Sequence, residues 1–123
     1  FISAPVGIDV IAIADGKVVY ANWIRGFGNV LIVDHGDDYM SLYGNNKILT
    51  KKVDETVHGG DIIAAVGNSD RNLDSGLYFE LSHEGEPFDP LTIFFTFLGT
   101  AEKKIAHFLI FLSDDSWKRC IFP

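Results

Sequence analysis

Short runs of apolar residues, separated by glycine and polar residues, make up the first three quarters of the chain. Six of these runs are rich in β-branched or aromatic residues and are short enough to be single strands. They lie at residues 10–14 (VIAIA), 17–23 (KVVYANW), 28–36 (GNVLIVDHG), 37–44 (DDYMSLYG), 59–70 (GGDIIAAVGNSD) and 76–90 (GLYFELSHEGEPFDP). Short strands at this spacing, with no long helical period, predict an antiparallel all-β domain.

Turn residues between the runs predict three tight turns. Asp15-Gly16 separates the first two runs and suits a type I′ hairpin, in which both central residues need positive φ. Gly36-Asp37 and Glu84-Gly85 mark the other two turns. We expect antiparallel strands to meet at these positions.

The chain changes character near residue 93. Of the 12 glycines, 11 precede Phe94, whereas six of the ten phenylalanines lie in the last 30 residues. We therefore expect a β domain over residues 1–93 and a different tail over residues 94–123. The tail contains four apolar residues at helical spacing, Ile105, Phe108, Leu109 and Leu112. They predict a short amphipathic C-terminal helix that packs on the sheet or binds a partner. A non-native end is the third interpretation of this tail.

Composition restricts the classes of function. The 123 residues suffice for one domain, and the net charge of −7 disfavours nucleic acid or an anionic membrane surface as the main partner. Cys120 is the only cysteine, so the chain cannot form an internal disulfide or a CxxC metal site. It begins at Phe1 and contains no apolar stretch long enough to span a membrane. We expect it to be part of a longer protein, in which targeting and any membrane association lie upstream.

No residue pattern in the chain is that of a recognisable active site. The four histidines are His35, His58, His83 and His107. None of them has the spacing that places two rings on one face of a strand or helix, although a zinc site built from distant histidines stays open at this point. The serines lack a GxSxG context, and the acidic residues 34, 37 and 38 lack the closing glutamate of a calcium loop. The residues alone predict no catalytic residue, no metal site and no cofactor.

Five segments resemble those of the lysostaphin-type (LytM-like) zinc peptidoglycan endopeptidases, in the same order and with similar spacing. They read AIADGKVVYANW, GFGNVLIVDHGDDYMSLYG, GGDIIAAVG, GLYFEL and PFDPL. The resemblance covers residues 1 to about 93. It implies a compact, mostly antiparallel β domain with a long groove across its sheet.

The residues that carry the chemistry of that family are replaced in this chain. Active members bind zinc through a His and an Asp four residues apart and through the second His of an HxH strand. The resemblance places Phe1 at the Asp position, and Asn45 where another His assists the chemistry. Gly76 and Tyr78, in SGLYFEL, replace the two histidines of the HxH strand. Because a catalytic zinc needs three protein ligands and a water, the resemblance implies a domain that neither holds zinc nor cleaves peptide bonds.

The segments SLYG and GLYFE resemble in particular the degenerate EnvC-type branch of the family, whose members activate cell-wall amidases during bacterial cell division. This implies a non-catalytic activator, in the periplasm or cell envelope, with a cell-wall amidase as its partner. We expect a partner-binding groove at the vacated site, lined by Tyr43, Asn45, Leu77 and Tyr78, with core packing as the alternative for Tyr43 and Leu77. Two other functions stay open. They are a zinc endopeptidase that cleaves peptidoglycan cross-links and a non-catalytic peptidoglycan-binding module.

Overall fold

The computed structural model describes residues 1–69 and 72–88, which form nine strands. The strands are β1 (Ile2–Ser3), β2 (Asp9–Ile11), β3 (Gly16–Ile24), β4 (Gly28–Gly36), β5 (Tyr39–Leu49), β6 (Thr56–Val57), β7 (Ile62–Ser69), β8 (Asn72–His83) and β9 (Glu86–Phe88). These residues contain no helix, and so none that is long and apolar enough to cross a membrane. The predicted all-β fold is confirmed. The predicted C-terminal helix and the boundary at residue 93 lie outside the described residues.

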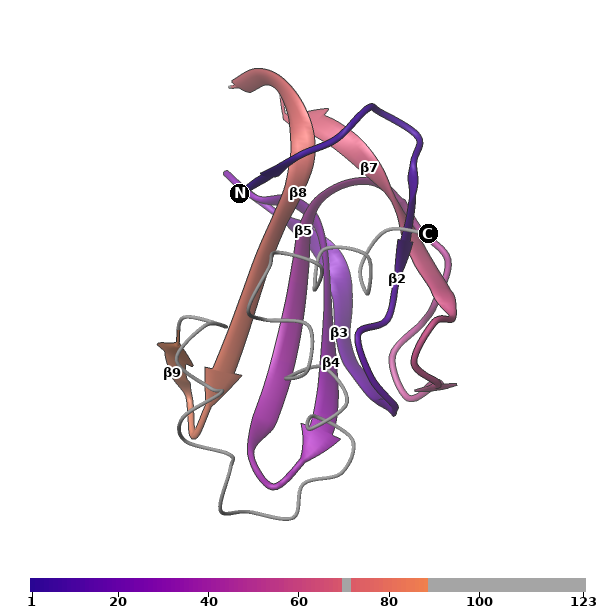
Figure 1. Cartoon of the computed structure of the whole chain (residues 1–123), viewed down its shortest axis with the longest axis vertical. Coiled ribbons are helices and arrows are strands. Elements are labelled where there is room, and N and C mark those ends of the chain that lie inside the picture. Colours follow the sequence, from indigo (N-terminus) through magenta and orange to yellow (C-terminus); the bar gives the residue numbers. More distant parts are fainter. Residues whose placement is uncertain (70–71, 89–123) are drawn as a thin grey trace, which may run out of the picture.

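The strands form one curled antiparallel sheet with the order β1-β8-β7-β5-β4-β3-β6. Off this path, β2 pairs with β7 and β9 pairs with β8. The long β4–β5 hairpin stands in the middle, with β2 and β7 on one side and β8 and β9 on the other (Figure 1). The strand β8 pairs with both β7 and β5, so it joins the two sides of the sheet.

Part of the core follows the two-residue period of the strands. Leu31 and Val33 on β4 are fully buried, whereas Ile32 between them is only half-buried. Fully buried side chains from the other strands join them, namely Val10, Val18, Tyr43, Val57, Ile63, Val66 and Leu77. Burial of each large apolar side chain contributes about 2 kcal/mol. A slip of one residue in register would turn these side chains to the opposite face, so the core fixes the register.

Two of the three predicted turns are confirmed. The β4–β5 turn has positive φ at Gly36, Asp37 and Asp38. The β8–β9 turn has positive φ at both Glu84 (53°) and Gly85 (80°), as a type I′ hairpin requires.

The predicted type I′ hairpin at Asp15-Gly16 is wrong. The strand before it, β2, pairs with β7, and the strand after it, β3, pairs with β4 and β6. Neither Asp15 nor Gly16 has positive φ. A Cβ atom at Gly16 would lie 2.5 Å from the carbonyl oxygen of Asp34 and 2.6 Å from Val33 Cγ1. The glycine is therefore needed for the close approach of β3 to β4, which the sequence signal does not distinguish from a turn.

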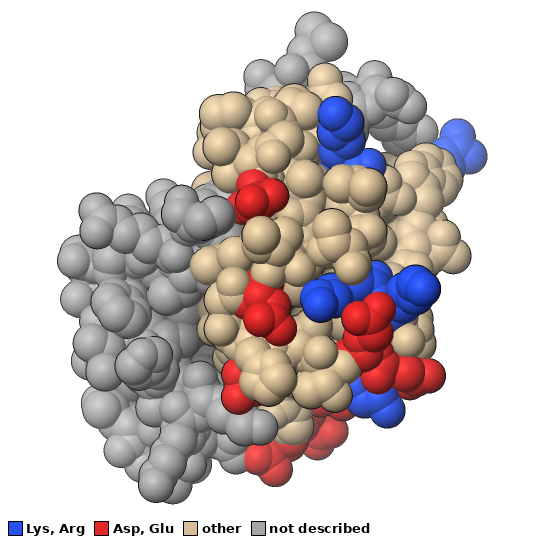
Figure 2. All heavy atoms as spheres, turned by 90° about the vertical axis from the view of Figure 1, so that its right-hand side faces the viewer, with Lys and Arg blue, Asp and Glu red and all other residues tan. Residues whose placement is uncertain are grey.

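Charged side chains of both signs are mixed on the face that carries β2 and β7 (Figure 2). The described residues form the surface ion pairs Lys17–Asp54, at 3.4 Å, and Lys51–Glu55, at 4.0 Å. Such exposed pairs add little stability, because solvent screens them.

Candidate functional site

The strand β8 changes partner where the sequence predicts a vacated site. On one side of this point Gly76 pairs with Gly67 of β7, and on the other Tyr78 pairs with Gly44 of β5. The short strand β1 runs across the same point, with Ser3 opposite Gly76. The segments that carry the four vacated positions thus meet in one place.

The phenyl ring of Phe1 and the backbone of β1 cover Gly76. A Cβ atom at this position would lie 2.6 Å from Phe1 Cζ and closer still to the carbonyl oxygen of Ile2. A side chain therefore cannot be added at residue 76 unless β1 moves. The absence of a side chain at Gly76 is what allows β1 to lie over this position.

Asn45 joins three strands at the same point. Its backbone has φ of 64°, and its N–H donates to the carbonyl of Phe27. Its side-chain Nδ2 donates to the carbonyl oxygens of Gly76, at 2.8 Å, and Gly67, at 3.3 Å. Asn45 is only 6% exposed, so the expectation that its side chain faces a partner is wrong. The amide instead holds β7 and β8 together where they diverge.

Tyr78 is the one vacated position with an accessible polar side chain. It is half-buried and lies on the same face of β8 as Gly76, two residues away. Its ring packs edge-on against Phe27, with 5.2 Å between the ring centroids and 67° between the planes. A Cβ atom on the opposite glycine, Gly44, would lie 3.4 Å from Tyr78 Cβ. Phe27 and Phe1 are 43% and 57% exposed, so three aromatic residues form an accessible surface around this point.

The sequence did not single out Phe27. It lies between two glycines in the loop that joins β3 to β4. The sequence carries no strong signal for it, because single exposed apolar residues are common on protein surfaces. We call Phe1, Phe27 and Tyr78 the aromatic surface.

Tyr43 and Leu77 do not line a groove, because both are fully buried in the core. Leu77 points away from Gly76 and Tyr78, its neighbours on β8, as strand alternation requires. The hydroxyl of Tyr43 accepts a hydrogen bond from the N–H of Ile13 at 3.0 Å and lies 3.0 Å from Ser41 Oγ. Burial raises the pKa of Tyr43 from 10.0 to about 12. Core packing, the alternative given for these two residues, is what the structure has.

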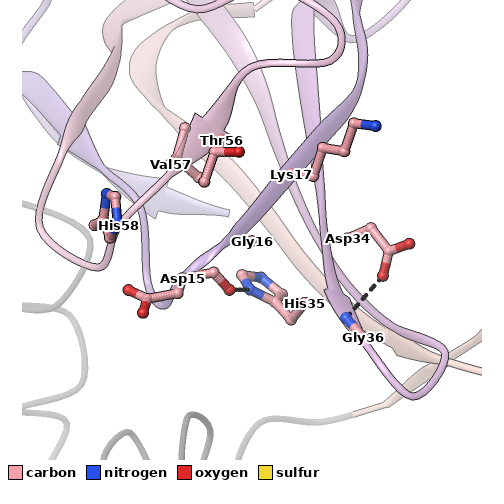
Figure 3. A pocket seen from close by; sticks show the side chains of 9 residues that line it. All are labelled: Asp15, Gly16, Lys17, Asp34, His35, Gly36, Thr56, Val57 and His58. Atoms are coloured by element: carbon pink, nitrogen blue, oxygen red, sulfur yellow. Dashed lines mark hydrogen bonds between the residues drawn. The ribbon is translucent and has the colours of Figure 1, made fainter.

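A hollow with a volume of about 480 Å³ lies where β3 begins and β4 ends, away from the vacated site (Figure 3). It contains His35 and His58, and both ring nitrogens of His35 already have partners. Nδ1 of His35 lies 2.8 Å from the carbonyl oxygen of Asp15, and its Nε2 lies 2.7 Å from Ser41 Oγ. Because a carbonyl oxygen can only accept a hydrogen bond, Nδ1 of His35 carries a proton. Its Nε2 lies against the hydroxyl of Ser41. Nδ1 of His58 lies 3.7 Å from Asp61 Oδ2.

The zinc that the family resemblance implies does not fit the residues of the vacated site. Phenyl and phenol rings, a glycine and an amide that donates to two carbonyls do not supply the imidazole and carboxylate ligands of zinc. In the described part of the chain, no three His, Cys, Asp or Glu side chains are grouped to hold a metal ion.

Residues 1–90 match Peptidase family M23. The chain belongs to this family. Among curated M23 relatives, Murein hydrolase activator EnvC of Escherichia coli (strain K12) is 43% identical over 89 residues, which are 72% of this chain and 21% of that protein. Murein hydrolase activator NlpD of the same organism is 40% identical over 86 residues, or 69% of this chain and 22% of that protein. The chain spans about a fifth of the length of these relatives.

The fold agrees with solved M23 structures. The catalytic domain of lysostaphin from Staphylococcus simulans superposes with a TM-score of 0.68 at 25% identity, covering 73% of this chain and 72% of that domain. The predicted resemblance to lysostaphin-type domains, and within them to murein hydrolase activators, is therefore confirmed.

Proposed function

We propose that this chain is a non-catalytic activator of a cell-wall amidase, and that it acts in bacterial cell division and daughter-cell separation. The proposal is supported by relatives that are named murein hydrolase activators. The observation that carries it is the closure of the vacated site. Phe1 and β1 cover Gly76, and the side-chain amide of Asn45 donates hydrogen bonds to two backbone carbonyls.

The aromatic surface is the part of the vacated site that can bind the amidase. Tyr78, Phe27 and Phe1 offer apolar area, and Tyr78 adds a phenol that donates and accepts hydrogen bonds. Asn45, Tyr43 and Leu77 support this surface from below, and they do not touch the partner. This assignment replaces the groove of four residues that the sequence predicted.

Activation then follows from a difference in affinity. The amidase exists in inactive and active states, and an activator shifts it only by the factor with which it prefers the active state. The chain would bind the active amidase through the aromatic surface and leave the bond cleavage to the amidase. Its place would be the periplasm or cell envelope, with peptidoglycan as a second partner.

A dye-release assay with labelled peptidoglycan and a purified cell-wall amidase tests the proposal. We expect no release by the chain alone and increased release when the amidase is present. Tyr78→Ala and Phe27→Ala should each raise the chain concentration needed for half-maximal stimulation about tenfold, as loss of a central aromatic contact does. Val53→Ala, which removes an exposed apolar side chain from the loop between β5 and β6, is the matched control.

Three results would contradict the proposal. Release of dye by the chain alone would show a peptidoglycan hydrolase. Unchanged stimulation by Tyr78→Ala and Phe27→Ala would exclude the aromatic surface as the contact. Sedimentation with peptidoglycan, combined with no effect on any amidase, would favour the peptidoglycan-binding module.

A further inference from the structure

The outer edge of β3 is only partly covered by the sheet. Its neighbour β6 pairs with Gly16 and Lys17, and the backbone groups of Val18 bond to residues 54 and 55. Beyond Val18, no strand within residues 1–69 and 72–88 pairs with this edge. We call residues 19–24 on this side of β3 the free edge.

Two residues of the free edge direct their backbone groups away from β4. The N–H of Trp23 donates to Oδ1 of Asn22 at 2.8 Å, so it is not part of the β3–β4 ladder. Residues of an antiparallel strand alternate between bonding to the neighbour and pointing away, and no register shift separates Trp23 from Ala21. The backbone N–H and C=O groups of Ala21 therefore point away from β4 as well. Rotation of the Asn22 side chain would release the Trp23 donor to an incoming strand.

The free edge lacks most of the features that normally protect an exposed edge. Proteins discourage pairing at edges with lysine, proline or bulges. Residues 18–24 contain no charge and no proline, and the one protective feature is the register shift between Val18 and Tyr20. Trp23 is 59% exposed and Val19 is 41% exposed, so apolar side chains flank the outward backbone groups.

The charges around the free edge select the kind of chain that fits it. Lys17 precedes the uncharged stretch and Arg25 follows it, and Arg25 has no ion pair with a described residue. A second copy paired antiparallel about Ala21 would place its Arg25 at Lys17, where β6 already pairs with β3. Lys17 is already bridged to Asp54, so Arg25 is the cation that an added strand can meet, and a carboxylate at the end of that strand beside Arg25 has the complementary charge.

We infer that the free edge of β3 binds an extended segment of another protein as an added strand. That segment has alternating apolar residues at its centre and a carboxylate at the end that lies beside Arg25. Main-chain hydrogen bonds to Ala21 and Trp23 hold it, Val19 and Trp23 pack on it, and Arg25 pairs with a terminal carboxylate. The free edge is separated from β8 by β4 and β5, so this inference does not rest on the proposed function.

A peptide titration followed by NMR tests this inference on the 123-residue chain. The probe is a short synthetic peptide in which valine alternates with threonine between two terminal glutamates, and its control carries lysine at both ends. We expect the amide signals of Ala21 and Trp23 to shift and their hydrogen exchange to slow. The glutamate-ended peptide should bind about fivefold more tightly than the lysine-ended one, as exposed charge pairs do.

Two variants locate the site. Ala21→Pro removes an outward N–H at an edge position where proline is tolerated, so it should abolish binding while the chain stays folded. Arg25→Glu should reverse the preference and favour the lysine-ended peptide. Three results would overturn the inference. They are peptide binding that survives Ala21→Pro, amide-signal shifts confined to residues around Phe27 and Tyr78, and dimerisation of the chain through β3.

Discussion

Asn45 allows the sharpest test of how the vacated site is built, because two separate costs meet at this residue. Its side chain donates to the carbonyls of Gly67 and Gly76, and its backbone has a positive φ of 64°. Asn45→Gly removes the hydrogen bonds but tolerates the backbone. Asn45→Ala removes the same bonds and also strains the backbone.

The expected sizes follow from these two costs. Loss of the donor leaves two buried carbonyls without that partner, which costs about 2 kcal/mol of unfolding free energy for either variant. A left-handed backbone adds about 1 kcal/mol for alanine but not for glycine. We therefore expect a loss of about 2 kcal/mol for Asn45→Gly and about 3 kcal/mol for Asn45→Ala.

Urea unfolding followed by tryptophan fluorescence measures these losses. With a urea dependence of about 1.5 kcal/mol per molar, the midpoints should fall by about 1.3 M and 2 M. Under the proposed function, stimulation of an amidase measured below the unfolding transition should stay within about twofold of the parent for both variants, because Asn45 is buried. Two results would refute this account of Asn45. One is an Asn45→Gly variant as stable as the parent, and the other is an Asn45→Ala variant that is more stable than Asn45→Gly.

Three further predictions concern the same core and site. Because burial raises the pKa of Tyr43 from 10.0 to about 12, its phenol keeps its proton in the folded state where the unfolded chain loses it. The stability from this group is thus complete below pH 10 and declines by about 2 kcal/mol as the pH rises to 12. Alkaline unfolding of Tyr43→Phe should lack this decline, and an equal slope in both proteins would contradict the prediction. Gly76→Ala should lower the unfolding free energy by about 2–3 kcal/mol in a urea titration, because its Cβ collides with the β1 backbone, whereas a neutral effect would show that β1 is not fixed there. Calorimetric titration with zinc should show no saturable site, and one zinc bound per chain with micromolar affinity would contradict the account of the vacated site.

The sequence could place most strands and two turns, because these depend on neighbouring residues. Residues 28–36 were predicted as a strand and form β4, and Glu84-Gly85 was predicted as a turn and has the two positive φ angles. Asp15-Gly16 was predicted as a hairpin on the same grounds and is not one. Its glycine is needed because β4 comes within 2.5 Å of where a Cβ would lie, and that approach depends on strands distant in sequence.

The candidate site was harder to predict because it depends on which face each residue occupies. Strand alternation alone could have shown that Leu77, between Gly76 and Tyr78, points to the opposite face. The role of Asn45 could not be foreseen in this way. Its amide reaches residues 22 and 31 positions further along the chain, and only the pairing of β5, β7 and β8 brings them within hydrogen-bonding distance.

The vacated site is therefore a closed junction of strands with an exposed aromatic rim. A histidine at residue 76 would need β1 to leave, and a histidine at residue 45 would release the carbonyls of Gly67 and Gly76 from their donor. Either substitution by histidine would thus destabilise the sheet before it could contribute to binding a metal. Tyr78 is different, because its half-buried ring holds no buried hydrogen bond among the described residues and contacts Phe27 at the surface. Substitution there should change the accessible surface at little cost to the fold, so under the proposed function residue 78 is the position where partner choice can vary independently of stability.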